Sequence, residues 1–308
     1  MFRWIMVLAL VGIVTSVLWQ ELRYLHARRD VVHDEQPLLY SSRAFHVVTF
    51  LHFSSRGLDA DVSDDAELIA ALRDLRDVSE AGADAQVVYA GKVALNALAS
   101  KQLVERFGGE VPWSAVLLTQ FASRAAADRA LASDRYREVL ARFGQAYSCG
   151  IQRSAWVNLG IPVILLGKRI GQVLSGEPSY FPFVPSAEAN PAIEARAAQL
   201  LRAREYGAHA VVVVNLIRQG TPANAAADRR YTAQMFGMMA EGVHGPMHVG
   251  VAVPLVTGDQ FDRVALVYYP GVQYFADMMR SRFYRGIVGD KQLADTQASI
   301  TVPVLDRL

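Results

Sequence analysis

Two copies of one pattern decide the fold. Residues 113–139 read WSAVLLTQFASRAAADRALASDRYREV, and residues 261–287 read FDRVALVYYPGVQYFADMMRSRFYRGI. Each copy opens with an aliphatic and aromatic run that is typical of a strand and continues into a stretch that predicts a helix. Both helical parts contain Ser-x-x-Tyr-Arg, beginning at Ser133 and Ser281, so the copies lie 148 residues apart.

The correspondence reaches beyond this motif. At the offset of 148, the matched positions are Trp113 with Phe261, Phe121 with Tyr269, Tyr136 with Tyr284 and Arg137 with Arg285. At slightly different offsets, the matched positions are Tyr89 with His248, Gly91 with Gly250 and His52 with Asn215. Agreement at so many positions indicates more than a chance match. We interpret it as a tandem duplication of one domain.

Periodicity around the two copies predicts the same order of elements in each half. In the first half, strands are expected at 45–53, 86–98, 113–121 and 149–157, and helices at 64–82 and 123–143. In the second half, strands are expected at 208–217, 247–256, 261–269 and 297–305, and helices at 225–242 and 271–288. Both halves therefore read β-α-β-β-α-β, which is the ferredoxin-like order.

These patterns divide the chain into four parts: an anchor and connector at 1–36, a first repeat at 37–158, a linker at 159–207 and a second repeat at 208–308. The linker opens with LGIPVILLG (159–167), which is too short to span a bilayer as a helix, and resumes a helical pattern at 187–205. Two interpretations of this part are open. It packs on the two domains, or its apolar run and YFPFVP (180–185) touch the membrane surface.

Composition excludes several classes of protein. The chain has 308 residues, 52% of them hydrophobic and 20% charged, which is enough for one large core or two small ones. Its formal net charge is +1 and its basic residues form no stripe, so no nucleic-acid partner is expected. Cys149 is the single cysteine, which excludes intrachain disulfides and cysteine-based zinc sites.

The N-terminus carries a membrane signal. Residues 4–19, WIMVLALVGIVTSVLW, are uncharged and have tryptophan at both ends. As a helix this run would reach about 24 Å, short of the ~30 Å hydrocarbon core, and the terminal tryptophans and flanking arginines would make up the difference. A cleaved signal peptide is the alternative, but the run ends without a small-x-small cleavage site. We expect a retained single-pass anchor with the body on the cytoplasmic side, from the count of Lys and Arg.

The stretch AVLLTQFASRAAADRALASDRYREVLARF (115–143) resembles the domain of unknown function 1330 family, in the dimeric α/β-barrel superfamily. The resemblance rests on a strand ending in Phe and Ser, an Ala-rich helix, then Ser-x-x-Tyr and a downstream Arg, which here are Phe121, Ser123, Ser133, Tyr136 and Arg142. It covers residues 44–158 well and 208–308 more weakly. The chain departs from the family pattern in the Asp that the family has early in its first helix: the first repeat has none at that place, and the second offers only Asp228, ahead of Tyr231.

The resemblance implies a fold rather than a reaction. Members of that superfamily pair two such units back to back in one barrel, and here both units are in one chain. We therefore expect an α+β protein in which two ferredoxin-like βαββαβ units form an intrachain pseudo-dimeric α/β barrel behind one N-terminal transmembrane helix. Some relatives bind haem through a histidine, but nothing in this sequence selects one.

Candidate site residues come from the same patterns. Ser-x-x-Tyr-Arg places Tyr136, Tyr284 and Arg285 on helices, where they would either orient an anionic or carbonyl ligand or pack a helix on a sheet. His52 and Asn215 are polar residues late in apolar strands, where a buried polar group needs a partner. Each of them either finds a hydrogen bond at a strand end or points into a cavity.

Two further positions are candidates because the copies differ there: Tyr89 in the first half and His248 in the second. His244 and His248 also have the spacing of a metal pair on a helix, but Gly245 and Pro246 predict a turn into a strand instead. We expect no metal site. The sequence has no nucleophile elbow, phosphate-binding loop or dinucleotide fingerprint.

These observations favour a membrane-tethered binding or interaction module, with a barrel cavity for a small, mostly apolar ligand. The alternative is a cofactor-poor enzyme of monooxygenase or isomerase type that acts on a small apolar or aromatic substrate there. The catalytic candidates are His52 and Tyr136, and the ligand-binding candidates are His52, Tyr89, Asn215, His248, Tyr284 and Arg285. No cofactor is expected. The expected partners are the membrane and the small ligand, and the sequence leaves room for a protein partner.

Overall fold

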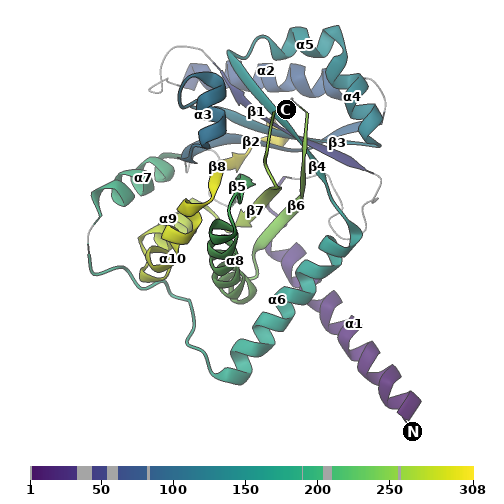
Figure 1. Cartoon of the computed structure of the whole chain (residues 1–308), viewed down its shortest axis with the longest axis vertical. Helices are drawn as coiled ribbons and strands as arrows, with labels where there is room; N and C mark the ends of the chain where they lie inside the picture. The colour runs from purple at the N-terminus through teal and green to yellow at the C-terminus, as the bar shows by residue number, and fades with distance from the viewer. Residues whose placement is uncertain are drawn as a thin grey trace.

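The computed structural model describes residues 2–32, 44–53, 62–81, 84–188, 190–203, 210–255 and 258–308. Its centre is a closed barrel of antiparallel strand pairs, in the order β1-β3-β2-β8-β5-β7-β6-β4 (Figure 1). Two pairings, β2 with β8 and β4 with β6, join the halves of the chain. The predicted α+β fold with an intrachain barrel is therefore confirmed.

Each half contributes four strands and its own helices. In the N-terminal half these are β1 (Phe45–His52), α2 (Val62–Glu80), β2 (Ala85–Leu98), α3 (Lys101–Phe107), β3 (Ala115–Phe121), α4 (Arg124–Ala132), α5 (Asp134–Leu140) and β4 (Gln145–Gln152). In the C-terminal half they are β5 (Val211–Arg218), α8 (Pro222–Gly242), β6 (Gly245–Pro254), β7 (Arg263–Tyr269), α9 (Val272–Arg280), α10 (Arg282–Leu293) and β8 (Asp295–Pro303). The predicted order is present in both halves, with each second helix split in two.

The repeated serine explains the split. Ser133 ends α4 and begins α5, and its hydroxyl accepts a hydrogen bond from the backbone N–H of Tyr136 at 3.3 Å. Ser281 does the same between α9 and α10, where it accepts from the N–H of Tyr284 at 3.1 Å. A serine N-cap satisfies one of the free N–H groups at a helix start. Ser-x-x-Tyr therefore marks a turn between two helices.

Strand pairing gives the correspondence between the halves residue by residue. Thr49 lies opposite Leu117, and Asn215 lies opposite Ala265, so Asn215 corresponds to Thr49. The predicted match of His52 with Asn215 is wrong, because it followed polar character rather than register. The matches of Tyr89 with His248 and of Gly91 with Gly250 agree with the pairing.

Side chains fill the inside of the barrel. One apolar cluster there includes the large buried residues Phe50, Tyr89, Trp113, Tyr147 and Tyr268. An eight-stranded barrel has an interior just wide enough for such side chains. The expectation of a ligand cavity in the barrel interior is therefore not met by the described residues.

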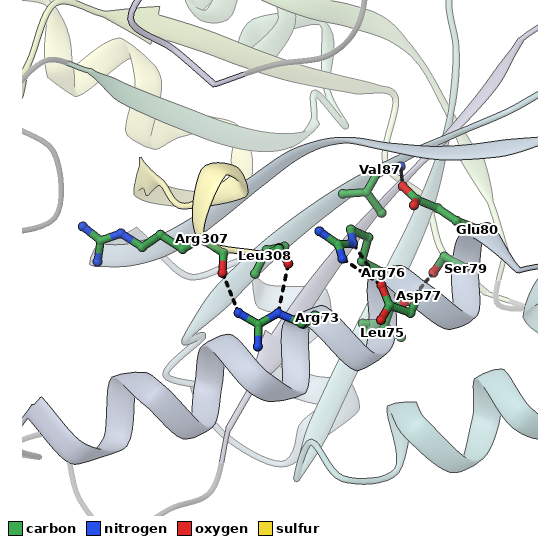
Figure 2. A network of polar contacts seen from close by, with 9 residues as sticks. All are labelled: Arg73, Leu75, Arg76, Asp77, Ser79, Glu80, Val87, Arg307 and Leu308. Carbon is green, nitrogen blue, oxygen red and sulfur yellow. Dashed lines mark hydrogen bonds and ion pairs between the residues drawn. The ribbon is translucent and has the colours of Figure 1, made fainter.

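Two groups of helices cover the outside of the sheet. α2, α4 and α5 lie over the N-terminal half, and α8, α9 and α10 lie by the C-terminal half (Figure 1). The end of the chain returns to the N-terminal half, where the Arg73 guanidinium on α2 donates to the backbone carbonyls of Arg307 and Leu308 at 2.9 Å each (Figure 2). The two halves are thus tied together outside the barrel as well as by strand pairing.

The N-terminal helix α1 (Phe2–Ala27) continues well past the predicted span of 4–19, and extends away from the body (Figure 1). Within it, Met6–Ala27 is long and apolar enough to cross a membrane, a property that anchors share with signal sequences and core helices. Its last turns pack on the barrel, where the Tyr24 hydroxyl donates to the carbonyl of Gly245 at 2.7 Å.

The segment between the halves begins with a long helix, α6 (Ala155–Ser175), that runs through Pro162. The predicted strand at 149–157 is wrong at its C-terminal end, because Ser154 caps this helix by accepting from the N–H of Val157 at 3.2 Å. α6 contacts α1 and packs on α8. Its other side leaves large apolar side chains exposed: Val163, Ile164, Ile170, Val173 and Leu174.

The rest of this segment packs on the C-terminal half. Tyr180 meets Phe283 edge to face with ring centroids 4.9 Å apart, and Phe183 meets Tyr274 at 5.1 Å. The interpretation as a packed linker therefore fits residues 180–185. The helical pattern that follows is confirmed as α7 (Pro191–Arg202), which packs against α9.

Candidate functional site

A cavity of about 110 Å³ lies outside the barrel, between the C-terminal half of the sheet and helices α8, α9 and α10. Its apolar lining includes Val213, Met235, Phe236, Met239, Val267 and Phe275. Its polar lining includes Asn215, Asp228, Tyr231, Arg263, Tyr284 and Lys291. A concave, mostly apolar site with a few convergent polar groups is the usual form of a small-molecule site.

The size of one side chain on the sheet helps to explain the hollow. Ala265 on β7 lines the cavity opposite Asn215 on β5. At the corresponding place in the N-terminal half, Leu117 stands opposite Thr49 and is buried in the apolar cluster that includes residues of α2 and α5. An alanine fills less of the space between sheet and helices than a leucine does, so room is left beside Asn215.

Lys291 on α10 lies at the polar end of the cavity. Its Nζ donates to Asn215 Oδ1 at 3.0 Å and lies 5.5 Å from the centroid of the Tyr231 ring, within cation–π range. The Asn215 amide is itself fixed, because its Nδ2 donates to the backbone carbonyls of Val213 and Ala265 at 3.2 Å each. The lysine amine is therefore held in a defined position.

Burial lowers the pKa of Lys291 to about 8, because removal from water penalises the charged ammonium. The nearby carboxylate of Asp228 acts in the opposite direction and offsets part of this effect. An ordinary lysine, with a pKa of about 10.4, is almost wholly protonated at neutral pH. Lys291 can exchange a proton near neutral pH, as a general acid or base must.

Asp228 and Arg263 form an ion pair in the cavity wall. Arg263 Nη2 lies 2.7 Å from Asp228 Oδ2, and Gln219 Nε2 donates to the same oxygen at 2.9 Å. A buried carboxylate needs partners of this kind to offset its loss of hydration. The cavity therefore contains a compensated ion pair and, apart from it, the amine of Lys291.

Tyr231 and Tyr284 supply two hydroxyls to the cavity, and each side chain influences the pKa of the other. Burial raises the pKa of both residues, so both stay protonated at neutral pH. Such hydroxyls can donate a hydrogen bond to a ligand oxygen. In the N-terminal half, Thr49 and Ser148 lower the pKa of the counterpart Tyr136 against the larger effect of burial, and their own hydroxyls lie 2.9 Å apart.

Of the predicted site residues, the structure brings Asn215 and Tyr284 together at the cavity. Tyr136 lies in the filled core of the other half. Arg285 points away and donates to the hydroxyl of Ser186 at 2.5 Å and to the backbone carbonyl of Glu188. Arg285 therefore fastens the segment between the halves to α10.

The other three predicted residues lie elsewhere. His52 Nδ1 is 2.8 Å from a backbone carbonyl oxygen, which is the hydrogen bond at a strand end that was one of its two interpretations. The Tyr89 hydroxyl is 2.8 Å from Thr301 Oγ1 in the buried barrel interior. His248 is buried with its Nδ1 2.5 Å from Arg153 Nη1. None of them lines the described cavity.

The histidine pair does not form a metal site. β6 begins at Gly245, as the predicted turn into a strand requires, and His244 packs between the rings of Tyr269 and Tyr274. Burial lowers the pKa of His244 to about 4. Among the described residues, no group of three or more His, Cys, Asp or Glu is placed to hold a metal ion. Nor does a histidine line the described cavity, so its residues do not fit a haem held by histidine.

Three residues of the site, Lys291, Tyr231 and Arg263, are not among the predicted ones. A signal for the lysine is present, since Lys291 follows Tyr284 by seven residues and therefore lies on the same helix face two turns later. Asp228 also lines the cavity. No comparable signal marks Arg263, which opens an apolar strand.

The sequence matches no known protein family and no curated protein. Similar solved structures include a variant of chlorite dismutase from Candidatus Nitrospira defluvii, 11% identical with a TM-score of 0.43, where the match covers 89% of this chain and 98% of that one. Another is an anthrone oxidase-like protein, 10% identical with a TM-score of 0.42, covering 86% and 94%. At such sequence identities and TM-scores the likeness says nothing about activity. The assignment of a closed barrel comes from the strand pairing described above.

Proposed function

We propose that this protein is a cofactor-poor enzyme of isomerase or monooxygenase type that acts on a small, mostly apolar molecule in the cavity of its C-terminal half. The observation that carries the proposal is the amine of Lys291, held by Asn215 at the polar end of an apolar cavity. A titratable group with a perturbed pKa in such a place is typical of catalytic sites. We favour the isomerase type, because proton transfer needs no second reactant.

Lys291 would move the proton. Its neutral amine would accept a proton from a carbon next to a carbonyl group, and the ammonium would return that proton to another carbon, with no net oxidation or reduction. The hydroxyls of Tyr231 and Tyr284 would donate hydrogen bonds to the carbonyl oxygen as negative charge grows there. This assigns the acid–base role to Lys291 in place of His52 and Tyr136.

The second candidate is a membrane-tethered module that binds the same ligand without converting it. Long apolar side chains of α1 are exposed, including Trp4 at 73% and Trp19 at 63%. The end of the same helix is buried at Gln20, Glu21 and Tyr24, and it contacts α6 and the start of β6, so its removal as a signal sequence would remove packing from the folded body. We infer that α1 is retained as a single-pass anchor, with the body in the cytoplasm.

The repeat is part of the same proposal. We infer that the halves are tandem copies of a unit related to the domain of unknown function 1330 family. The support is their common element order and the common offset of their strand partners, such as Leu117 and Ala265. Cross-pairing of β2 with β8 and of β4 with β6 is how two such units would close one barrel.

Binding of two matched probes tests the function. Acetophenone and ethylbenzene have similar skeletons and differ in the carbonyl oxygen. We expect the full chain in lipid nanodiscs to bind acetophenone roughly tenfold or more tightly, since a hydrogen bond to a charged group contributes about 1.5–3 kcal/mol. In Lys291→Met the preference for acetophenone should become smaller, and the part that remains comes from the hydroxyls of Tyr231 and Tyr284. Equal affinities in the wild type, or no binding of either probe, would contradict the proposal.

Turnover separates the enzyme from the binding module. In heavy water, the wild type should speed the exchange of the methyl protons of bound acetophenone, measured by the loss of their NMR signal. Lys291→Met should show the rate of the solution without protein. Tight binding of acetophenone without faster exchange would favour the module that does not convert its ligand.

A further inference from the structure

The chain has four lysines, Lys92, Lys101, Lys168 and Lys291. Lys291 is the one that lines the described cavity, whereas Lys101 and Lys168 are exposed at the surface. The chain thus contains its own reference for amine chemistry, because two lysines are exposed and Lys291 is half-buried in the cavity wall. Any reaction specific to the cavity should distinguish them.

Carboxylates near Lys291 are engaged by other residues. Asp228 is paired with Arg263 at 2.7 Å, and Asp290, the neighbour of Lys291 in sequence, is paired with Arg230 at 2.7 Å. The partner that the structure gives the lysine amine is the neutral amide oxygen of Asn215. A neutral acceptor holds the amine in place without requiring its positive charge, so the amine can lose a proton and stay positioned.

We propose that the ligands of this cavity are aldehydes and ketones, and that Lys291 binds them covalently as an imine. The inference rests on the proposed function, because the same cavity must admit the ligand. Lys291 Nζ adds to the carbonyl carbon to give a carbinolamine, and loss of water then forms the C=N bond. The carbonyl oxygen leaves with both amine hydrogens, so nothing is oxidised or reduced.

The surroundings of the amine suit this chemistry. The neutral amine is the nucleophile, and the pKa of Lys291, lowered to about 8 by burial, makes that form accessible near neutral pH. The hydroxyls of Tyr231 and Tyr284 can donate to the departing oxygen. A protonated imine would keep the position over the Tyr231 ring that the ammonium now occupies at 5.5 Å.

Reductive trapping tests the inference on the wild-type full chain. Benzaldehyde with sodium cyanoborohydride converts an imine into a stable benzylamine, and peptide mass spectrometry locates the adduct. Near neutral pH we expect Lys291 to be labelled roughly tenfold or more faster than Lys101 and Lys168, because a larger fraction of its amine is neutral. Its labelling rate should rise with pH with a midpoint near 8. Labelling of Lys291 no faster than the exposed lysines would overturn the inference.

Two variants and a competitor complete the test. Lys168→Arg, on the exposed face of α6, should leave labelling of Lys291 unchanged, and Lys291→Arg should leave only the slow adducts at the other lysines. Ethylbenzene should protect Lys291 and not Lys168. If acetophenone binds more tightly than ethylbenzene but no adduct forms at Lys291, the imine is overturned and the proposed function stands. If there is neither preference nor adduct, both are overturned.

Discussion

The two halves of the barrel share one frame, yet one half is filled and the other is hollow. In the N-terminal half, Leu117 and Tyr136 complete an apolar cluster with residues of α2 and α5. In the C-terminal half, Ala265 stands at the place of Leu117, and Tyr284, the counterpart of Tyr136, lines a cavity of about 110 Å³. The same strand register therefore supports either a core or a pocket, depending on a few side chains.

The polar groups of the two halves differ at corresponding places too. Where the N-terminal half has Thr49, Ala115, Ala146 and Ser148, the C-terminal half has Asn215, Arg263, Thr296 and Ala298. The pKa of Tyr136 is influenced by Thr49 and Ser148 of the first set, whereas the pKa of Tyr284 is influenced by Tyr231. The positions that pack in the core of the N-terminal half therefore hold, in the C-terminal half, groups that can contact a ligand.

The largest effect should come from making the N-terminal half hollow. Leu117→Ala is expected to lower the free energy of unfolding by about 2–5 kcal/mol, because it leaves a cavity in a packed cluster. Denaturant unfolding of the wild type and the variant measures this loss. The mirror variant Ala265→Leu adds volume where space exists and should change stability by less than about 1.5 kcal/mol. Similar losses in both variants would contradict the difference between the halves.

A smaller effect concerns pH. The pKa of Lys291 is about 8 in the folded protein and about 10.4 in the unfolded chain. Between these pH values the unfolded chain binds more protons than the folded protein does. The titration of Lys291 therefore makes the free energy of unfolding rise with pH from about 8 to about 10.4. Below pH 8 the burial of the charged amine destabilises the folded protein by its full amount. Lys291→Met should remove this rise and increase the free energy of unfolding at pH 7 by about 1–2 kcal/mol, since the lost bond to Asn215 offsets part of the gain.

Unfolding curves recorded at several pH values check this prediction. The matched control is Lys168→Met, which removes an exposed lysine on α6 and should keep the pH dependence of the wild type. An increase of stability that is the same at pH 7 and above pH ~10.4 would not fit a desolvated amine at position 291.

The smallest effects should come from the two serine caps. Ser281→Ala and Ser133→Ala each remove a hydroxyl that accepts from a helix N–H, which costs roughly 0.5–2 kcal/mol. Ser281 is fully buried and Ser133 is exposed, so the larger loss is expected at Ser281. The free energy of unfolding of each variant gives the order, and a larger loss at Ser133 would reverse it.

Much of the fold could be predicted from the sequence, because hydrophobic periodicity indicates the helices and strands and the repeated residues indicate how the two halves correspond. Strand and helix order follow from side-chain spacing, and the second occurrence of the sequence pattern gives the offset that relates the strands. The helix α6 is missed in part, because Pro162 and the apolar run hide a capped helix that begins at Ala155. A serine that could cap a helix is weak evidence for a helix start when the end of the preceding strand is not known.

The site is less predictable, because it depends on which residues are opposite each other across strands. His52 lies three residues beyond Thr49, so alternation along the strand puts the two side chains on opposite faces. The space beside Asn215 comes from Ala265, which is fifty positions away in the chain. Polar character alone therefore selects His52 and Asn215 as a pair, and strand register separates them.

The dissociation constant of acetophenone in the wild type and in Ala265→Leu tests the central claim most directly. This substitution installs in the hollow half the residue that the filled half has at the same position. We predict that the wild type binds acetophenone at one site. In the variant the affinity should be at least roughly tenfold lower, because the added side chain occupies the ligand's space. The free energy of unfolding of the variant should change by less than about 1.5 kcal/mol. Unchanged affinity in a folded Ala265→Leu protein would contradict the account.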